Sequence, residues 1–158
     1  RVSSSRLQEL LADPARIQDE LYPEHYPANL EQRGCNVEKT WNAIEFILDR
    51  LAETDGIPEI LPLTEGAETG CVLHYGPVWF RTASEVAEIA SVLKTLSRDD
   101  FRKGFLPDLM SEHHVYPGDW DEEDQEWLFN YVWSHFENMV EFYQAAAEDG
   151  DAVLLHLG

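Results

Sequence analysis

The sequence predicts an α+β fold: a mostly helical single domain with a small sheet, a long central helix near the C-terminus and a final strand. Three observations support this prediction. Apolar residues recur at helical spacing in three long segments, β-branched and aromatic residues gather over residues 71–80, and an apolar segment follows Gly150. A chain of 158 residues, 44% of them hydrophobic, is long enough to bury one good core.

Prolines divide the first part of the chain into separate predicted helices. Ser5 and Gln8 have the spacing of a capping box, so a first helix begins near Ser5 and ends before Pro14. A short second helix is predicted over residues 15–21. Asn36 is a suitable N-cap for a third helix, because its side-chain oxygen can accept a backbone N–H. The apolar stripe of that third helix comprises Val37, Trp41, Ile44, Leu48 and Leu51.

Residues 53–70 form the longest predicted loop, since they hold three Gly, two Pro and five acids with little periodicity. A mobile surface loop is the preferred interpretation, and a functional loop is the alternative, since long ordered loops are often functional. A strand pair or a bent strand follows over residues 71–80, interrupted at Gly76-Pro77.

Two further helix starts follow in the middle of the chain. Thr82 and Glu85 have capping-box spacing and precede an apolar stripe. The stripe comprises Val86, Ile89, Ala90, Leu93 and Leu96. Ser97 with Asp100 opens a shorter helix, and another turn follows Pro107.

The longest predicted helix begins after four acids at 121–124, which suit the positive end of a helix dipole. Its apolar stripe comprises Leu128, Val132, Phe136, Met139, Tyr143 and Ala146. The helix ends near Gly150, and residues 152–157 predict a mostly buried strand. That strand needs a partner, which the 71–80 segment can supply.

Composition excludes several classes of protein. The chain has 31 acids against 11 basic residues, a formal net charge of −20, so direct nucleic-acid binding is disfavoured because phosphate contacts need clustered Lys and Arg. No apolar run approaches the roughly 20 residues of a membrane span. Cys35 and Cys71 form no disulfide framework and no metal-like spacing, which fits a reduced cytoplasmic protein. We expect residues upstream of Arg1, because the chain does not begin with Met.

The acids are unevenly placed, and their placement gives the leading functional hypothesis. Residues 104–158 hold thirteen acids and no Lys or Arg. Such a surface can steer a basic protein, so we expect a non-enzymatic interaction module, most concretely an immunity protein that neutralises a basic toxin. The candidate partner-binding residues are Asp119, Trp120, Asp121, Glu122, Glu123, Asp124 and Glu126, and a second candidate contact face runs from Glu137 to Asp151. Trp120 lies in a turn where we expect it to be exposed, whereas periodicity assigns Trp41, Trp127 and Trp133 to the core. Adaptation of the whole surface to high salt is a further interpretation of the acidity.

An alternative hypothesis is a small enzyme or ligand-binding protein with an aromatic pocket. The candidate pocket residues are Trp41, Glu45, His74, Tyr75 and Tyr116, in which a Glu–His pair could do acid–base work. A buried His74 that has its hydrogen-bond partners is the preferred interpretation of that residue. The sequence has no nucleophile elbow, Walker loop, zinc-protease motif or dinucleotide fingerprint, so we assign no catalytic residue, metal ligand or cofactor.

Four blocks of sequence succeed one another in a recognisable order. They are V-E-K-T-W-N-A-I-E-F-I-L from Val37, Y-G-P-V-W-F from Tyr75, V-Y-P-G from Val115 and G-D-A-V-L-L-H-L-G from Gly150. This succession resembles the YfbM-like family, small bacterial proteins of unknown function. The resemblance implies one α+β domain over residues 1–158, usually opened by a short N-terminal strand that we expect this chain to lack.

The resemblance implies no established activity or catalytic residue. The family often has His at the position that Glu45 holds here, after the landmark Trp41. A chemical role for that His would therefore be missing from this protein. This departure argues against a shared enzymatic mechanism.

Overall fold

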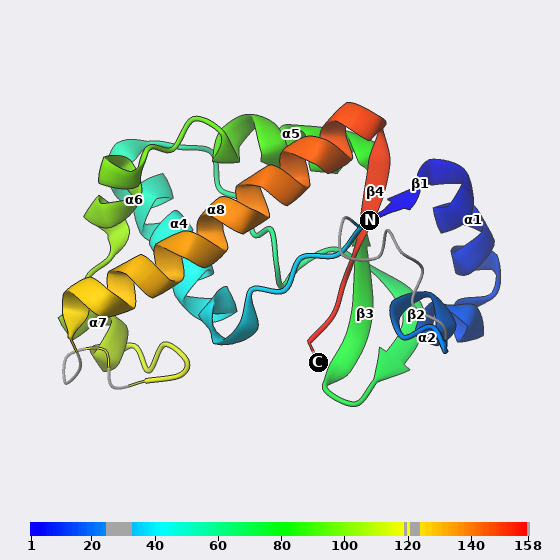
Figure 1. The fold of residues 1–158 in the computed structure, drawn as a ribbon, viewed down its shortest axis with the longest axis horizontal. Helices are drawn as coiled ribbons and strands as arrows, with labels where there is room; N and C mark the ends of the chain where they lie inside the picture. The colour runs from blue at the N-terminus through cyan, green and yellow to red at the C-terminus, as the bar shows by residue number, and fades with distance from the viewer. Residues whose placement is uncertain (25–32, 119, 121–123, 158) are drawn as a thin grey trace.

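Four short strands form one antiparallel sheet within the described part of the chain (Figure 1). The structure, a computed structural model, describes residues 1–24, 33–118, 120 and 124–157. The strands are β1 Val2–Ser3, β2 Ala67–Leu73, β3 Gly76–Arg81 and β4 Asp151–Leu155, in the order β1-β4-β3-β2. β2 and β3 form a hairpin, and β4 lies between β1 and β3. The predicted pairing of the final strand with the 71–80 segment is confirmed.

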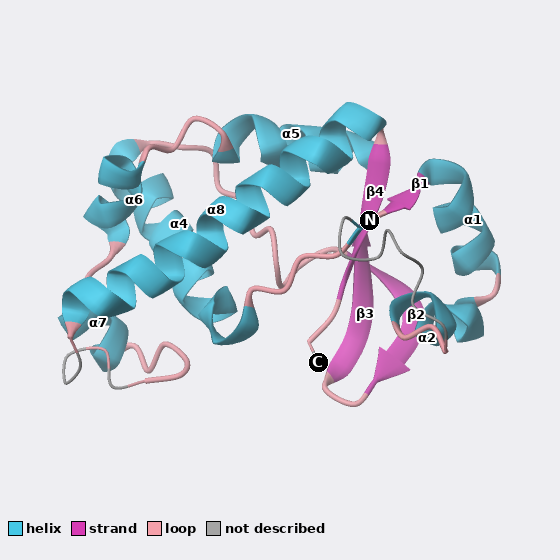
Figure 2. Cartoon of the chain, viewed as in Figure 1, coloured by secondary structure: helices cyan, strands magenta, loops and turns pink. Residues whose placement is uncertain are grey.

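Helices dominate the rest of the described chain and confirm the mostly helical α+β prediction (Figure 2). They are α1 Ser4–Ala12, α2 Ile17–Leu21, α4 Trp41–Asp55, α5 Ala83–Leu93, α6 Arg98–Gly104, α7 Pro107–Glu112 and α8 Gln125–Asp149. Short 3-10 turns at Pro14–Arg16 and Glu38–Thr40 precede α2 and α4. Among the described helices, none combines the length and the apolar character needed to cross a membrane.

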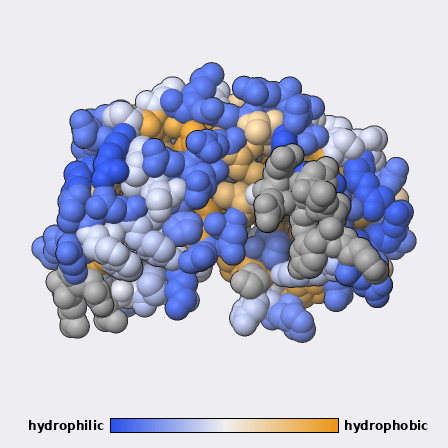
Figure 3. All heavy atoms as spheres, in the orientation of Figure 1, coloured by the Kyte–Doolittle hydropathy of each residue, from blue (hydrophilic) through white to orange (hydrophobic). Residues whose placement is uncertain are grey.

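The sheet separates two hydrophobic clusters. Successive strand residues point to opposite faces, so β4 contributes Ala152 to the cluster beneath α1 and α2 and Val153 to the larger cluster of α4, α5 and α8. In the larger cluster Phe101 of α6 stacks on Phe136 of α8 with ring centroids 4.2 Å apart. Gly104 lets α6 approach α4 closely, since an added Cβ would lie 2.8 Å from the Ile47 carbonyl oxygen. Hydrophobic side chains reach the surface in a strip between α5 and α8 (Figure 3).

The helix ends follow local sequence signals in most cases. The capping boxes of α5 at Thr82 and of α6 at Ser97 are both formed, as predicted. α8 ends at Gly150, whose φ of 67° is the left-handed conformation that glycine adopts without strain.

Two predicted helix starts are wrong. Ser3, not Ser5, caps α1 by accepting a hydrogen bond from the Arg6 N–H. Asn36 accepts from the Glu38 N–H, which starts a 3-10 turn instead of α4. α4 itself begins at Trp41, because the chain first makes the turn that brings Glu38 to α8.

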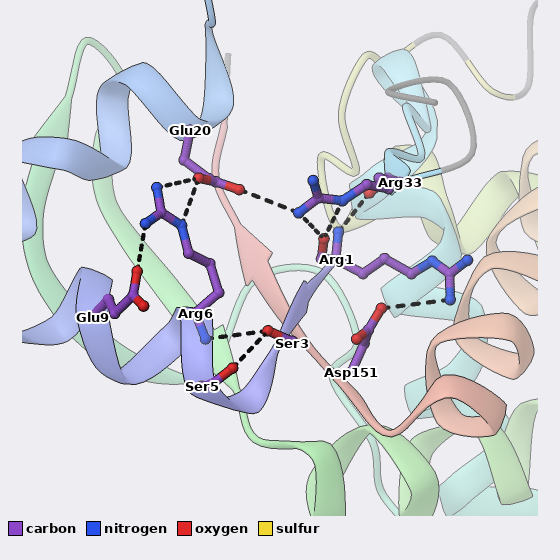
Figure 4. Close-up of polar contacts among 8 residues, drawn as sticks. All are labelled: Arg1, Ser3, Ser5, Arg6, Glu9, Glu20, Arg33 and Asp151. Carbon is purple, nitrogen blue, oxygen red and sulfur yellow. Dashed lines mark hydrogen bonds and ion pairs between the residues drawn. The ribbon is translucent and has the colours of Figure 1, made fainter. Parts of the chain in front are cut away.

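Arginine side chains hold the N-terminal segment to the rest of the molecule (Figure 4). Arg6 donates two hydrogen bonds to Glu20 Oε2, at 3.0 and 2.8 Å, and Arg33 donates to Glu20 Oε1 at 3.2 Å. Arg33 also donates to the Arg1 carbonyl oxygen, and Nη1 of the Arg1 guanidinium lies 3.6 Å from Asp151 Oδ2. We expected no strand at this end of the chain, whereas Val2–Ser3 pairs with β4. Much of the scarce positive charge is thus used inside the fold.

Candidate functional site

The start of α8 is fixed by Asp124. Its Oδ1 accepts hydrogen bonds from the Glu126 N–H at 3.0 Å and from the Trp127 N–H at 3.1 Å. A carboxylate at this position satisfies two N–H groups that lack helical partners and interacts favourably with the helix dipole. The capped first turn therefore presents Glu126 and Trp127 on a fixed backbone.

Trp127 presents a broad aromatic face to solvent. Its side chain is 59% exposed and stacks on Tyr131, one turn later, with ring centroids 5.6 Å apart and ring planes 2° from parallel. The Tyr131 hydroxyl donates to Glu38 Oε2 at 2.9 Å. Partial desolvation, reinforced by the negative charge of Glu38, raises the pKa of Tyr131, so the hydroxyl keeps its proton and remains a donor. The Trp127 ring therefore rests on a side chain that is itself held in place.

A second aromatic stack lies next to the same 3-10 turn. Trp41, the first residue after the turn, stacks on Tyr116 with ring centroids 6.1 Å apart. The Tyr116 backbone N–H donates to Asn42 Oδ1 at 2.8 Å, so α4 positions the Tyr116-Pro117 segment. Tyr116 is exposed, as is Trp127. The exposed rings of Tyr116 and Trp127 thus flank the Glu38–Thr40 turn and the start of α8.

We use the name α8 aromatic surface for Glu38, Asp124, Glu126, Trp127 and Tyr131. Three of these five residues are carboxylates, and within the described part of the chain one of them, Glu126, pairs with a cation, Arg102. Both members of that pair are exposed, so the contact contributes little to stability and can be exchanged for another. The α8 aromatic surface consequently combines a rigid apolar face with a negative surround.

The structure corrects the predicted environment of two tryptophans. Trp120 was expected to be exposed, but it is 2% exposed and its Nε1–H donates to the Val115 carbonyl oxygen at 2.7 Å. Trp127 was assigned to the core, but α8 extends beyond the core at its first turn. Trp133 is buried, as predicted. Periodicity identifies the face of a helix but not how far the core extends along it.

The predicted partner-binding residues have different outcomes. Asp124 and Glu126 lie on the α8 aromatic surface, whereas Trp120 is buried and cannot contact a partner. Asp119, Asp121, Glu122 and Glu123 lie outside the described residues. Trp127, Tyr131 and Glu38 were missed. The spacing of four residues between Trp127 and Tyr131 indicates that both lie on one face of a helix. Glu38 could not be found in this way, because it lies 93 residues before Tyr131 in the sequence.

Glu45 is a structural residue that fastens the predicted loop. Its side chain is 6% exposed and accepts hydrogen bonds from the Leu63 N–H, the Thr64 N–H and the Thr64 hydroxyl, at 3.0, 2.9 and 2.5 Å. Burial raises the pKa of the Glu45 carboxyl, although these hydrogen bonds oppose the shift. Both carboxylate oxygens of Glu45 accept hydrogen bonds from the loop, so Glu45 holds Leu63 and Thr64 against α4.

The same loop has two further attachments. Arg81 donates to the Leu61 carbonyl oxygen at 2.8 Å, and the buried Tyr143 hydroxyl donates to the Pro62 carbonyl oxygen at 2.5 Å. The loop is therefore tied to β3, α8 and α4 at once. The interpretation of residues 53–70 as a mobile surface loop does not fit this part of the segment.

The predicted pocket does not assemble. His74 and Tyr75 form the exposed turn of the β2–β3 hairpin, with Tyr75 72% exposed, so the preferred interpretation of His74 as a buried residue is wrong. In Figure 1 this turn lies at the end of the sheet, well apart from α4. The structure brings Trp41 to Tyr116 but forms no Glu45–His74 pair. In the described residues, no three His, Cys, Asp or Glu side chains are grouped to hold a metal ion.

These observations define the class of protein: a mostly helical α+β domain built on a small antiparallel sheet. Residues 1–156 match the family model described as Domain of unknown function (DUF1877), and the chain belongs to this family. A similar crystal structure is that of a protein of unknown function, YfbM from Escherichia coli. It has a TM-score of 0.62, 22% sequence identity, and coverage of 97% of this chain and 93% of that chain. This likeness shows the fold, and the predicted YfbM-like resemblance is confirmed. No curated protein matches the chain significantly.

Proposed function

We propose that this protein is a non-enzymatic interaction module that binds a basic protein through the α8 aromatic surface. The observation that supports the proposal most strongly is the exposed Trp127 face on its Tyr131 base. Tryptophan is enriched among residues that dominate binding energy, and its face attracts Lys and Arg side chains. A rigid aromatic group also loses little conformational freedom on binding.

The charge distribution supports a basic partner. Arg6 and Arg33 pair with Glu20, and Arg81 lies beside Glu85, so these cations neutralise acids that lie outside residues 104–158. A net charge of −20 raises the encounter rate with a cationic protein and repels acidic ones. An immunity protein that covers a cationic toxin in the bacterial cytoplasm is the most concrete form of this proposal.

The test is capture of a partner from a lysate of the native host at low salt, with release by a salt step and mass spectrometry of the eluate. The proposal expects one basic protein at near-stoichiometric yield, released as ions screen the contact. Charge neutralisation by Glu126→Gln should weaken the capture. An eluate without a basic protein, from bait shown to be folded, would overturn the proposal and lead next to ligand screening.

A further inference from the structure

A groove lies between the end of α5 and the middle of α8, in a different region from the α8 aromatic surface. Its volume is about 220 Å³, and its lining includes the partly exposed apolar side chains of Leu96 and Val140. Figure 3 shows hydrophobic side chains at the surface in the strip between these two helices. Pockets for small molecules usually measure about 300–1,000 Å³, so this groove is of a size for one side chain of a partner.

The rim of the groove is negative. Glu137 and Glu141 line it, one helical turn apart on α8, and both are exposed. Neither has an ion-pair or hydrogen-bond partner among the residues that the structure describes. Like charges at this spacing repel each other, so a cation placed between them would relieve an unfavourable interaction. Of the residues that the structure describes, Lys94 on the opposite rim is the one cation lining the groove, and two carboxylates outweigh it.

We propose that this groove receives an arginine side chain of the basic partner. The aliphatic stem would pack on Leu96 and Val140, which are partly exposed, and the guanidinium would lie between the carboxylates of Glu137 and Glu141. Arginine fits this arrangement better than lysine, because its planar group donates several hydrogen bonds in a fixed fork and can reach two carboxylates. The inference rests on the proposed function, since it names the chemistry of one contact with the same partner.

The experiment uses a defined probe and the full chain. N-acetyl-arginine amide is titrated at low salt into ¹⁵N-labelled protein, and N-acetyl-norleucine amide serves as the uncharged comparison. We expect saturable chemical-shift changes of the amides of Lys94, Leu96, Glu141 and Gln144, and weaker ones with norleucine. Shift changes that do not saturate, or that spread evenly over acidic positions, would overturn the inference.

Variants separate this site from general charge attraction. Glu137→Gln combined with Glu141→Gln should reduce the affinity for the arginine probe by about tenfold. The control is Glu148→Gln on the same helix, which removes an exposed carboxylate outside the groove and should change the affinity by less than about twofold. Equal losses in both variants would overturn the inference.

The two proposals fail in different ways. A failed groove titration leaves a partner captured through Trp127 unaffected. A failed capture together with saturable probe binding would instead overturn the proposed function and leave an arginine-binding groove.

Discussion

Trp120 and Trp127 lie seven residues apart and have opposite roles in this account. Trp120 is enclosed and hydrogen-bonded to Val115, whereas Trp127 is mostly exposed. We predict that Trp120→Ala lowers the free energy of unfolding by about 3–5 kcal/mol, because it leaves a cavity. Trp127→Ala should change it by less than about 0.5 kcal/mol. Urea denaturation followed by circular dichroism measures both, and a large loss in Trp127→Ala would show that this ring is structural.

Glu45 makes a second residue-scale prediction. Glu45→Ala removes the acceptor of three hydrogen bonds from Leu63 and Thr64 and should lower the free energy of unfolding by about 2–3 kcal/mol. Glu45→Gln keeps an acceptor oxygen and should lose much less. Denaturant titration of the two variants provides the comparison. If both lose the same stability, the negative charge of Glu45 matters more than its hydrogen bonds.

The buried carboxyl of Glu45 also predicts a pH dependence. Burial raises its folded pKa above the unfolded value of about 4.3, so the folded state holds the proton more tightly. The contribution of Glu45 to stability is then complete below about pH 4.3 and declines as the pH rises through the folded pKa. The free energy of unfolding of wild type minus that of Glu45→Gln should therefore fall from pH 4 toward pH 7. A difference that increases with pH would mean that the hydrogen bonds outweigh burial.

Among the elements, α8 links stability to the α8 aromatic surface. Asp124 caps the helix and also contributes a negative charge. We predict that Asp124→Ala costs about 1 kcal/mol of stability, while Asp124→Ser keeps the cap and most of the stability. Because Asp124→Ser removes only the charge, it should still weaken binding of a basic partner. Thermal denaturation and calorimetric binding distinguish the two roles, and unchanged binding by Asp124→Ser would exclude a role for this charge.

Element boundaries could be predicted where their causes are local. The capping boxes of α5 and α6 and the glycine end of α8 involve residues within a few positions of one another. The start of α4 could not be predicted, because the preceding turn is held by a bond from Tyr131 to Glu38, 93 residues apart in sequence. β1 was not expected either, since its two residues gain strand geometry from pairing with β4.

For the molecule as a whole, the sequence predicted the fold class but not which segments meet. The pairing of β4 with β3 followed from the need of an apolar strand for a partner, yet its place between β1 and β3 depends on long-range contacts. The pocket hypothesis failed for the same reason. His74 and Glu45 are both plausible acid–base residues, but the hairpin turn and α4 lie in different parts of the molecule (Figure 1).

The distribution of charge is a property of the whole chain that the sequence does predict. The surplus of acids over residues 104–158 can be read directly from the order of residues in the sequence. What the structure adds is the arginine network around Glu20, which uses cations to join the N-terminal segment to the fold (Figure 4). The aromatic part of the candidate site could not be predicted from the sequence, because periodicity does not show that Trp127 lies beyond the core.

The most direct test of the central claim is the dissociation constant of the captured basic partner, measured by calorimetry for wild type, Trp127→Ala and Tyr75→Ala. Both variants remove an exposed aromatic ring, but Tyr75 lies on the hairpin turn, outside the α8 aromatic surface. We predict that Trp127→Ala weakens binding by about 30-fold, as expected for a residue that dominates an interface, and that Tyr75→Ala changes it by less than about twofold. Wild-type affinity in Trp127→Ala, or an equal loss in Tyr75→Ala, would contradict the account.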